Sequence, residues 1–211
     1  PYADEKQRYQ TLALNLYPQL AQQVNASADP LLTAVKLSIA GNSIDHGVYH
    51  AMDESRALHA IDTALHQPLV GDIDRFRQDI AAAESILFLA DNAGEIVLDR
   101  LLLEQLPLAK TTVVMRGKPI LNDALLEEAR QAGLTGIVRV IDNGDNTPGT
   151  DLDQCRPEVV HAFNQADLII AKGQGNYETL SDTPANLVFL LKAKCPVVAE
   201  HIGCQLNDAL L

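Results

Sequence analysis

Two short polar stretches of this 211-residue chain carry residue types that could do chemistry. Residues 91–95 (DNAGE) follow the apolar run 86–90, and residues 172–176 (KGQGN) follow the apolar run 168–171. The first stretch offers the carboxylate and amide oxygens that a hard cation such as Mg²⁺ or Mn²⁺ prefers. The second offers a lysine and exposed backbone N–H groups, which suit a phosphate. Because ligands of an open α/β sheet bind beyond the carboxyl ends of its strands, both stretches point to one shared site.

Asp91 and Asn92 are the predicted cation ligands of the first stretch. Gly94 would let the backbone turn tightly into the next helix and leave the first N–H groups of that helix free. The alternative is that Asp91 or Asn92 simply caps this helix. Asp123 follows the next strand, and neighbouring parallel strands end side by side, so we expect it to reach the same cation. It could equally be the N-cap of a helix that begins at Ala124, and both roles are compatible.

Lys172 is the predicted phosphate ligand of the second stretch, because its charge could neutralise phosphoryl oxygens. Gly173 and Gly175 would permit close approach of the backbone to an anion. The segment is not a dinucleotide fingerprint, since Glu178 stands where the third glycine should be, and the chain has no Walker A loop. Arg116 could also meet phosphate oxygens, although isolated basic residues are more often solvated surface.

Other polar residues give weaker signals. Asn42 and Asp45 stand near the end of a predicted helix, where spacing alone favours a simple helix C-terminus. The six histidines show no metal-ligand spacing. The three cysteines fit neither a disulfide framework nor a zinc pair, which favours a reducing cytoplasm.

The apolar pattern predicts two parts of the chain that position these residues. Residues 1–83 show helical periodicity and are expected to form a helical annex, with helices over 12–24, 31–40, 55–66 and 73–83. Residues 84–211 alternate short apolar runs with amphipathic segments, which predicts a Rossmann-like α/β core with a mainly parallel sheet that carries the metal site. We expect strands over 86–90, 112–116, 136–141, 168–171, 187–191 and 196–199, and crossover helices over 97–106, 123–132 and 157–164. The irregular stretch 142–151 is where an active-site lid would sit.

The charge of the chain restricts its partners. Lys and Arg number 16 against 28 Asp and Glu, so the formal net charge is −12. Such an excess of acid disfavours a nucleic-acid partner held by phosphate contacts, and it disfavours an anionic membrane. We find no leader and no apolar run long enough to span a bilayer, so we expect a cytoplasmic protein with a small-molecule substrate.

Taken together, several segments resemble one family, the metal-dependent damage-control phosphatases catalogued as domain of unknown function eighty-nine, in particular its archaeal and bacterial stand-alone branch. The segments follow the order of the family and cover nearly the whole chain. They are 40–42 with Asp45, 91–95, 116–119 with 122–123, 148–150, 172–178 and 190–196. Family members usually begin with a further helical segment that carries a close pair of cysteines. This chain begins at Pro1 without it, so we expect a shorter form or a segment that is missing.

The resemblance implies a three-layer α/β/α sandwich with an N-terminal helical annex. It also implies a divalent cation (Mn²⁺, Mg²⁺, Co²⁺ or Ni²⁺) bound by Asp91, Asn92 and Asp123, and hydrolysis of small phosphometabolites such as sugar phosphates or damaged phosphorylated metabolites. The residues expected to carry catalysis are Asp91, Asn92, Asp123 and Lys172. Those expected to face the substrate are Asn42, Asp45, Glu95, Arg116, Gly173, Gly175 and Asn176.

The sequence leaves the mechanism open between two routes. A carboxylate could orient an attacking water, or Asp91 could attack directly and form an aspartyl-phosphate. The haloacid-dehalogenase arrangement is disfavoured, because position 93 is alanine and not a second aspartate. Two other functions remain as alternatives: an S-adenosylmethionine-dependent carboxyl methyltransferase, and a non-catalytic sensor that binds a phosphorylated metabolite in the same crevice.

Overall fold

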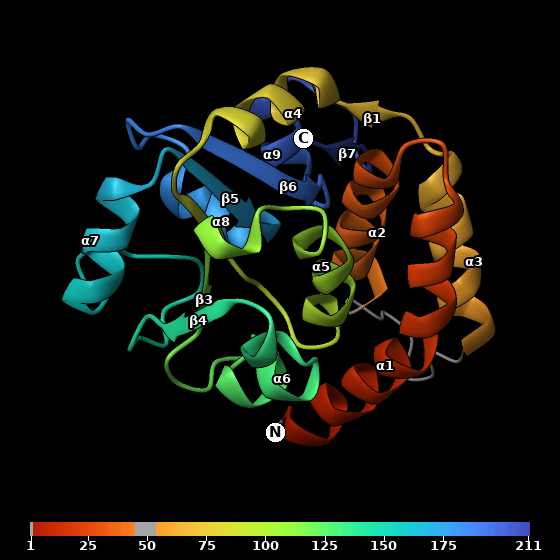
Figure 1. Ribbon diagram of the computed structural model, residues 1–211, viewed down its shortest axis with the longest axis horizontal. Helices are drawn as coiled ribbons and strands as arrows, with labels where there is room; N and C mark the ends of the chain where they lie inside the picture. The colour runs from red at the N-terminus through yellow and green to blue at the C-terminus, as the bar shows by residue number, and fades with distance from the viewer. Residues whose placement is uncertain (1, 45–53) are drawn as a thin grey trace.

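The structure is a computed structural model that describes residues 2–44 and 54–211 (Figure 1). Its helices are α1 (Ala3–Ala26), α2 (Pro30–Ile44), α3 (Glu54–His66), α4 (Ile73–Ala82), α5 (Glu95–Leu103), α6 (Leu126–Gln131), α7 (Pro157–Gln165), α8 (Gly173–Leu180) and α9 (Pro196–Ile202). Its strands are β1 (Leu69–Val70), β2 (Ile86–Leu89), β3 (Thr111–Met115), β4 (Arg139–Asp142), β5 (Leu168–Lys172), β6 (Leu187–Lys192) and β7 (Ala209–Leu210). Across the described residues, no helix combines the length and apolar character that a bilayer crossing requires.

The strands form one sheet in the order β1-β7-β6-β5-β2-β3-β4. All neighbours run parallel except β6 and β7, and β1 joins the sheet edge from within residues 1–83. From β2 the chain winds outward to β3 and β4, whereas β5 returns to the other side of β2 and leads to β6. The expected α/β fold with a mainly parallel sheet is therefore confirmed. The reversal between β2 and β5 is a topological switch point, where open α/β sheets bind ligands.

Helices cover both faces of the sheet because its central strands are apolar on both faces. Ile86 and Phe88 of β2 pack toward α2 and α5, in a cluster that extends into α1 and α3. Leu87 and Leu89 pack on the opposite face, toward α7 and α8. Figure 1 shows α1, α2 and α3 together on one side of the molecule, with α5 between them and the strands. The sandwich and the helical segment thus share one continuous core.

Helix α5 is buried on nearly every side. Each of its residues except Arg100 is buried, which is typical of a helix enclosed in a core. Gly41 lets α2 approach closely, since a Cβ placed there would lie 3.2 Å from Cα of Glu95. The two carboxylates on this helix, Glu95 and Asp99, therefore lie inside the protein, where charged groups require partners.

Three of the differences between the sequence predictions and the structure lie close to the expected site. Residues 196–199 were expected as a strand, which is wrong: they begin α9, because Pro196 suits the first turn of a helix and Gly203 ends it at φ +81°. Residues 173–180, which the sequence indicated only as a turn, continue into α8. Finally, α6 begins at Leu126, because the backbone N–H of Ala124 donates to the carbonyl oxygen of Asp91. Asp123 is therefore not the N-cap of that helix.

Candidate active site

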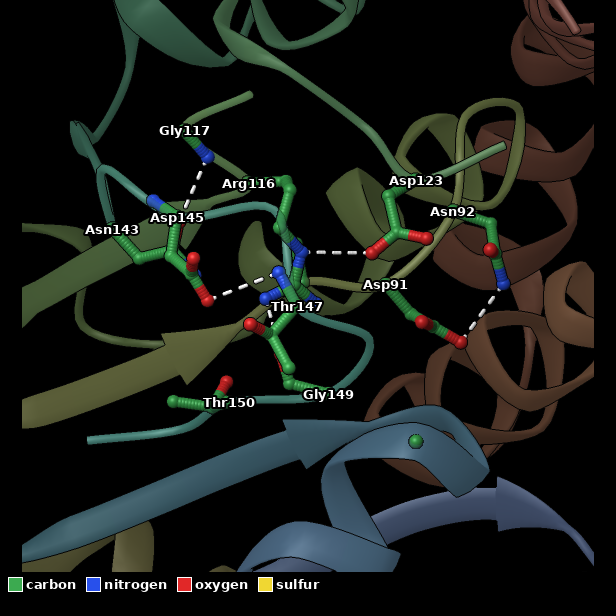
Figure 2. Close-up of polar contacts among 12 residues, drawn as sticks. Asp91, Asn92, Arg116, Gly117, Asp123, Asn143, Asp145, Thr147, Gly149 and Thr150 are labelled. Carbon is green, nitrogen blue, oxygen red and sulfur yellow. Dashed lines mark hydrogen bonds and ion pairs between the residues drawn. The ribbon is translucent and has the colours of Figure 1, made fainter. Parts of the chain in front are cut away.

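The loops after β2 and β3 are hydrogen-bonded to each other. The backbone N–H of Ala124 donates to the carbonyl oxygen of Asp91 over 2.9 Å, and Asn92 and Asp123 form an isolated antiparallel bridge. This backbone pairing holds Asp91, Asn92 and Asp123 side by side at the carboxyl ends of the two strands. Figure 2 shows their side chains grouped around one space. The three predicted cation ligands are thus neighbours in the folded chain.

The carboxylate of Asp91 is oriented by two side-chain amides. Its Oδ2 accepts hydrogen bonds from Nδ2 of Asn42 over 2.9 Å and from Nδ2 of Asn92 over 2.8 Å. Burial, together with the negative charges of Glu95 and Asp123, raises the pKa of Asp91 well above its usual range. The Asp91 carboxylate therefore lies close to other negative charges. The amides that donate hydrogen bonds to it are uncharged, so they do not neutralise its charge.

The Asp123 carboxylate is fixed by a buried ion pair. Its Oδ2 lies 2.8 Å from Nε of Arg116, and both side chains are almost fully buried. Burial raises the pKa of Asp123, although Arg116 acts in the opposite direction. Arg116 also donates to the carbonyl oxygen of Gly149, so it connects Asp123 to the segment 142–151 (Figure 2).

The segment 142–151 is tied down by hydrogen bonds at several points. Oδ1 of Asn143 accepts from the backbone N–H of Gly117 over 2.8 Å. At the other end, Oγ1 of Thr150 donates to Oδ1 of Asn176 over 2.7 Å. Between these anchors, Pro148 and Gly149 form part of a cavity wall. The segment expected as a lid therefore borders the site and is hydrogen-bonded to its surroundings at both ends.

Lys172 lies inside the protein, behind the site. It is fully buried, and its Nζ lies 2.9 Å from Oε1 of Glu95 and 2.8 Å from Oδ1 of Asp99. The same Nζ donates to the backbone oxygen of Ser38 over 2.9 Å and to its hydroxyl over 2.7 Å. Burial lowers the pKa of Lys172, but Asp99 and Glu95 outweigh it and leave the pKa raised. Lys172 is therefore surrounded by acceptors from the protein itself. Its side chain is not exposed to a phosphate, which was the contact expected from the sequence.

A cavity of about 750 Å³ opens at the carboxyl ends of the strands. It is lined by Asn42, Asp91, Asn92, Leu121, Asn122, Asp123, Pro148, Gly149, Gln174, Gly175, Glu178, Lys192, Lys194, Cys195 and Asn207. The lining includes five of the predicted site residues: Asn42, Asp91, Asn92, Asp123 and Gly175. The predicted residues Glu95, Arg116, Lys172, Gly173 and Asn176 are not among the lining residues. Asp45 lies outside the described residues.

The structure adds residues that the sequence reasoning did not assign to the site. Lys192 and Lys194 line the cavity at the end of β6. Their position directly after a predicted strand was the available signal, because that strand ends at the same edge of the sheet. Leu121 also lines the cavity; it is 51 % exposed and has a left-handed φ of +41°. A bulky residue in that conformation is uncommon and marks local strain.

The donor set fits a hard cation that keeps part of its water shell. Within the described residues, no group of three or more His, Cys, Asp or Glu side chains is placed to hold a metal ion. The site instead combines two carboxylates, Asp91 and Asp123, with the amide of Asn92. Mg²⁺-like ions use one or two carboxylates and complete their coordination with water and phosphate oxygens. A cation here would also offset the burial and the negative charges of Glu95 and Asp123, which together raise the pKa of Asp91.

Comparison with known proteins places the chain in a family. The model of the damage-control phosphatase ARMT1-like domain matches residues 1–210. The chain belongs to this family. It is 37 % identical to a protein of Archaeoglobus fulgidus named damage-control phosphatase, over 99 % of this chain and 74 % of that protein. It is 40 % identical to a damage-control phosphatase of Pyrococcus horikoshii, over 80 % of this chain and 60 % of the relative.

The fold is shared with a solved structure of the same family. A crystal structure of a family member from Pyrococcus horikoshii superposes with a TM-score of 0.83 at 33 % identity. The match covers 96 % of this chain and 73 % of the other. An uncharacterised protein of Methanocaldococcus jannaschii is 37 % identical, over 100 % of this chain and 72 % of that protein. The resemblance inferred from the sequence motifs is confirmed.

Gly173 is expected to tolerate a side chain poorly. Its φ is +79°, and a Cβ placed there would lie 1.9 Å from Oδ2 of Asp91. Gly203 has a similar φ of +81° but no atom within 4 Å of its Cβ position, so it is the matched control. We expect Gly203→Ala to lower the free energy of unfolding by about 1–2 kcal/mol through backbone strain. Gly173→Ala should cost about 1–3 kcal/mol more through the clash, as measured by urea unfolding. Equal losses would contradict this placement of Asp91.

Asp99 is expected to make stability depend on pH. Burial raises the pKa of Asp99 to about 7 against the opposing effect of Lys172. A raised pKa means that the native state binds the proton more tightly, so this residue costs stability as the pH rises from about 4 to 7. Asp99→Asn removes that cost. Its free energy of unfolding, relative to the unsubstituted protein, should therefore increase over this range by up to roughly 4 kcal/mol and then level off. A difference that stays constant across the range would contradict the assignment.

Proposed function

We propose that this protein is a divalent-metal-dependent phosphatase that hydrolyses phosphomonoesters of small metabolites. The observation that carries the proposal is the meeting of Asp91, Asn92 and Asp123 at a cavity of about 750 Å³, at the switch point of the sheet. Membership in a damage-control phosphatase family supports the reaction class. The volume suits a small phosphorylated metabolite, such as a sugar phosphate or a damaged phosphorylated metabolite.

Asp91, Asn92 and Asp123 would hold the cation, which would be Mn²⁺, Mg²⁺, Co²⁺ or Ni²⁺. When bound, such an ion supplies a Lewis acid that neutralises charge on the phosphoryl oxygens. Side chains of the protein would carry out the remaining steps of the reaction. Asp91 is held in one orientation by the amides of Asn42 and Asn92, so it is positioned either to orient a water or to attack the phosphorus itself.

The cavity also carries groups that suit the anionic end of a substrate. Lys192 and Lys194 line it from the end of β6. Gln174 and Gly175 belong to the first turn of α8, and the N-terminus of a helix attracts anions through its unpaired N–H groups. We propose that these lysines and the N-terminus of α8 bind the phosphate, which is the role that the sequence predicted for Lys172.

Asp91→Asn tests the proposed site directly. Phosphate release from phosphorylated sugars, nucleotides and cofactors would be measured with each of the four cations and again after chelation. We expect release to require a cation, and we expect Asp91→Asn to lower turnover by more than about 100-fold, because a cation ligand is lost. Asp62→Asn, in the exposed part of α3, is the matched control and should keep full turnover. Unchanged turnover of Asp91→Asn, or full activity in a chelator, would rule the proposal out. Cation-dependent binding of a substrate without phosphate release would favour a sensor.

A further inference from the structure

Glu95 contacts one of the proposed cation ligands, Asn92, from behind the cavity. It is buried in the first turn of α5, and its Oε2 accepts two hydrogen bonds. One comes from Nδ2 of Asn42 over 2.9 Å and the other from Nδ2 of Asn92 over 3.0 Å. Glu95 is not among the residues that line the cavity, so this contact with the amides is a different role from the substrate contact that the family resemblance implied.

The amide of Asn92 is held in one of its two orientations. Its Nδ2 donates to Oδ2 of Asp91 and to Oε2 of Glu95, which uses both of its protons (Figure 2 shows the first of these bonds). A half-turn of the amide would place its oxygen against two carboxylate oxygens and would be repelled. The oxygen of Asn92 is therefore kept away from both carboxylates and free to meet a cation.

Glu95 is itself fixed by Lys172. Nζ of Lys172 lies 2.9 Å from Oε1 of Glu95, while Oε2 of Glu95 faces the amides. Lys172 is anchored in turn by Ser38 of α2 and by Asp99 of α5. Burial raises the pKa of Glu95, but Lys172 and the amide donors outweigh it and leave the pKa lowered. Oε2 of Glu95 is thus hydrogen-bonded to the two amides, whereas Oε1 accepts no hydrogen bond from the described residues and lies against the Lys172 ammonium as an ion pair, an arrangement that favours this orientation of the carboxylate.

We infer that Glu95 is a positioning residue that, anchored by Lys172, orients the amide of Asn92 so that its oxygen faces the cation site. The inference rests on the proposed function, since it concerns the same cation. In this inference the fully buried Lys172 and Glu95 orient the cation ligand Asn92. The residues that line the cavity contact the substrate.

Glu95→Gln is the first test, because the positive charge of Lys172 attracts the oxygen of the introduced amide and repels its N–H groups. The introduced glutamine keeps its oxygen toward Lys172 and turns its N–H groups toward the amides of Asn42 and Asn92. Asn92 then reverses, so that nitrogen replaces oxygen at the cation site. We expect the dissociation constant for Mn²⁺, measured by titration calorimetry without substrate, to rise about 10–100-fold. Glu158→Gln, the same change at an exposed carboxylate of α7, is the matched control and should change the constant by less than about twofold.

Asn92→Asp is the second test, and here the strength of the ligand and the hydrogen bonds to Asp91 and Glu95 predict opposite changes in Mn²⁺ affinity. A carboxylate is a stronger ligand for a hard cation than an amide, so a role as ligand alone predicts equal or tighter Mn²⁺ binding. The inference predicts weaker binding, because the new carboxylate would face Asp91 and Glu95 without a proton to donate. In the double variant Glu95→Gln/Asn92→Asp, the glutamine N–H groups meet an acceptor again. We expect the double variant to bind Mn²⁺ more tightly than either single variant.

The outcomes separate this inference from the proposed function. Glu95→Gln with the Mn²⁺ affinity of the unsubstituted protein, or a double variant whose loss equals the product of the two single losses, would overturn the inference alone. Thermal unfolding without metal would verify that each variant is folded. If Glu95→Gln does not fold, the Mn²⁺ affinity of Asn92→Asp tests the inference instead. Failure of the unsubstituted protein to bind any of Mn²⁺, Mg²⁺, Co²⁺ and Ni²⁺ would overturn the proposed function and this inference with it.

Discussion

Four buried carboxylates lie at or behind the proposed cation site, namely Asp91, Asp123, Glu95 and Asp99, and the balance of their charge is the constraint on which the site depends. Lys172 lies between Glu95 and Asp99, and Arg116 pairs with Asp123. Asp91 differs from the other three, because its hydrogen-bonding partners are the uncharged amides of Asn42 and Asn92. Burial of unpaired charge is costly, which is why the pKa of Asp91 is raised well above its usual range. The proposed cation would supply the charge that this position lacks.

The fold separates the groups that meet the substrate from the groups that hold the site in shape. Behind the cavity, α2 and α5 pack closely at Gly41 and bring Asn42, Glu95 and Lys172 together. In front of it, the end of β6, the start of α8 and the loop residues Pro148 and Gly149 border the space for a ligand. Because the rear network uses partners from distant parts of the chain, we expect metal binding to depend on the packing of α2 against the sandwich.

Much of the site could be predicted from local sequence because each of the proposed cation ligands closely follows a strand along the chain. Asp91 and Asn92 follow a buried apolar run, and Asp123 follows the next one, so the parallel sheet brings them to one edge. The surroundings of Lys172 could not be predicted in this way. Its acceptors come from Ser38, Glu95 and Asp99, and nothing local to Lys172 indicates that the strand directs its side chain inward to them.

The same limit explains the errors in the elements. Residues 196–199 form an apolar run too short to distinguish a strand from a helix by periodicity, and the helix-start signal of Pro196 was the better guide. Arg116 was expected either to meet phosphate oxygens or to lie on the solvated surface, yet it is buried and its side chain turns toward Asp123 and Gly149. Pairing between loops, which a single sequence does not display, decides such orientations.

The most direct test of the central claim is to locate the cation. Crystals of the protein equilibrated with Mn²⁺ would be measured near the manganese absorption edge, and an anomalous difference map would be calculated. The account predicts one strong peak within about 2.0–2.4 Å of oxygens from Asp91, Asn92 and Asp123. A map without a peak at that position, or a peak bound by other side chains, would contradict it.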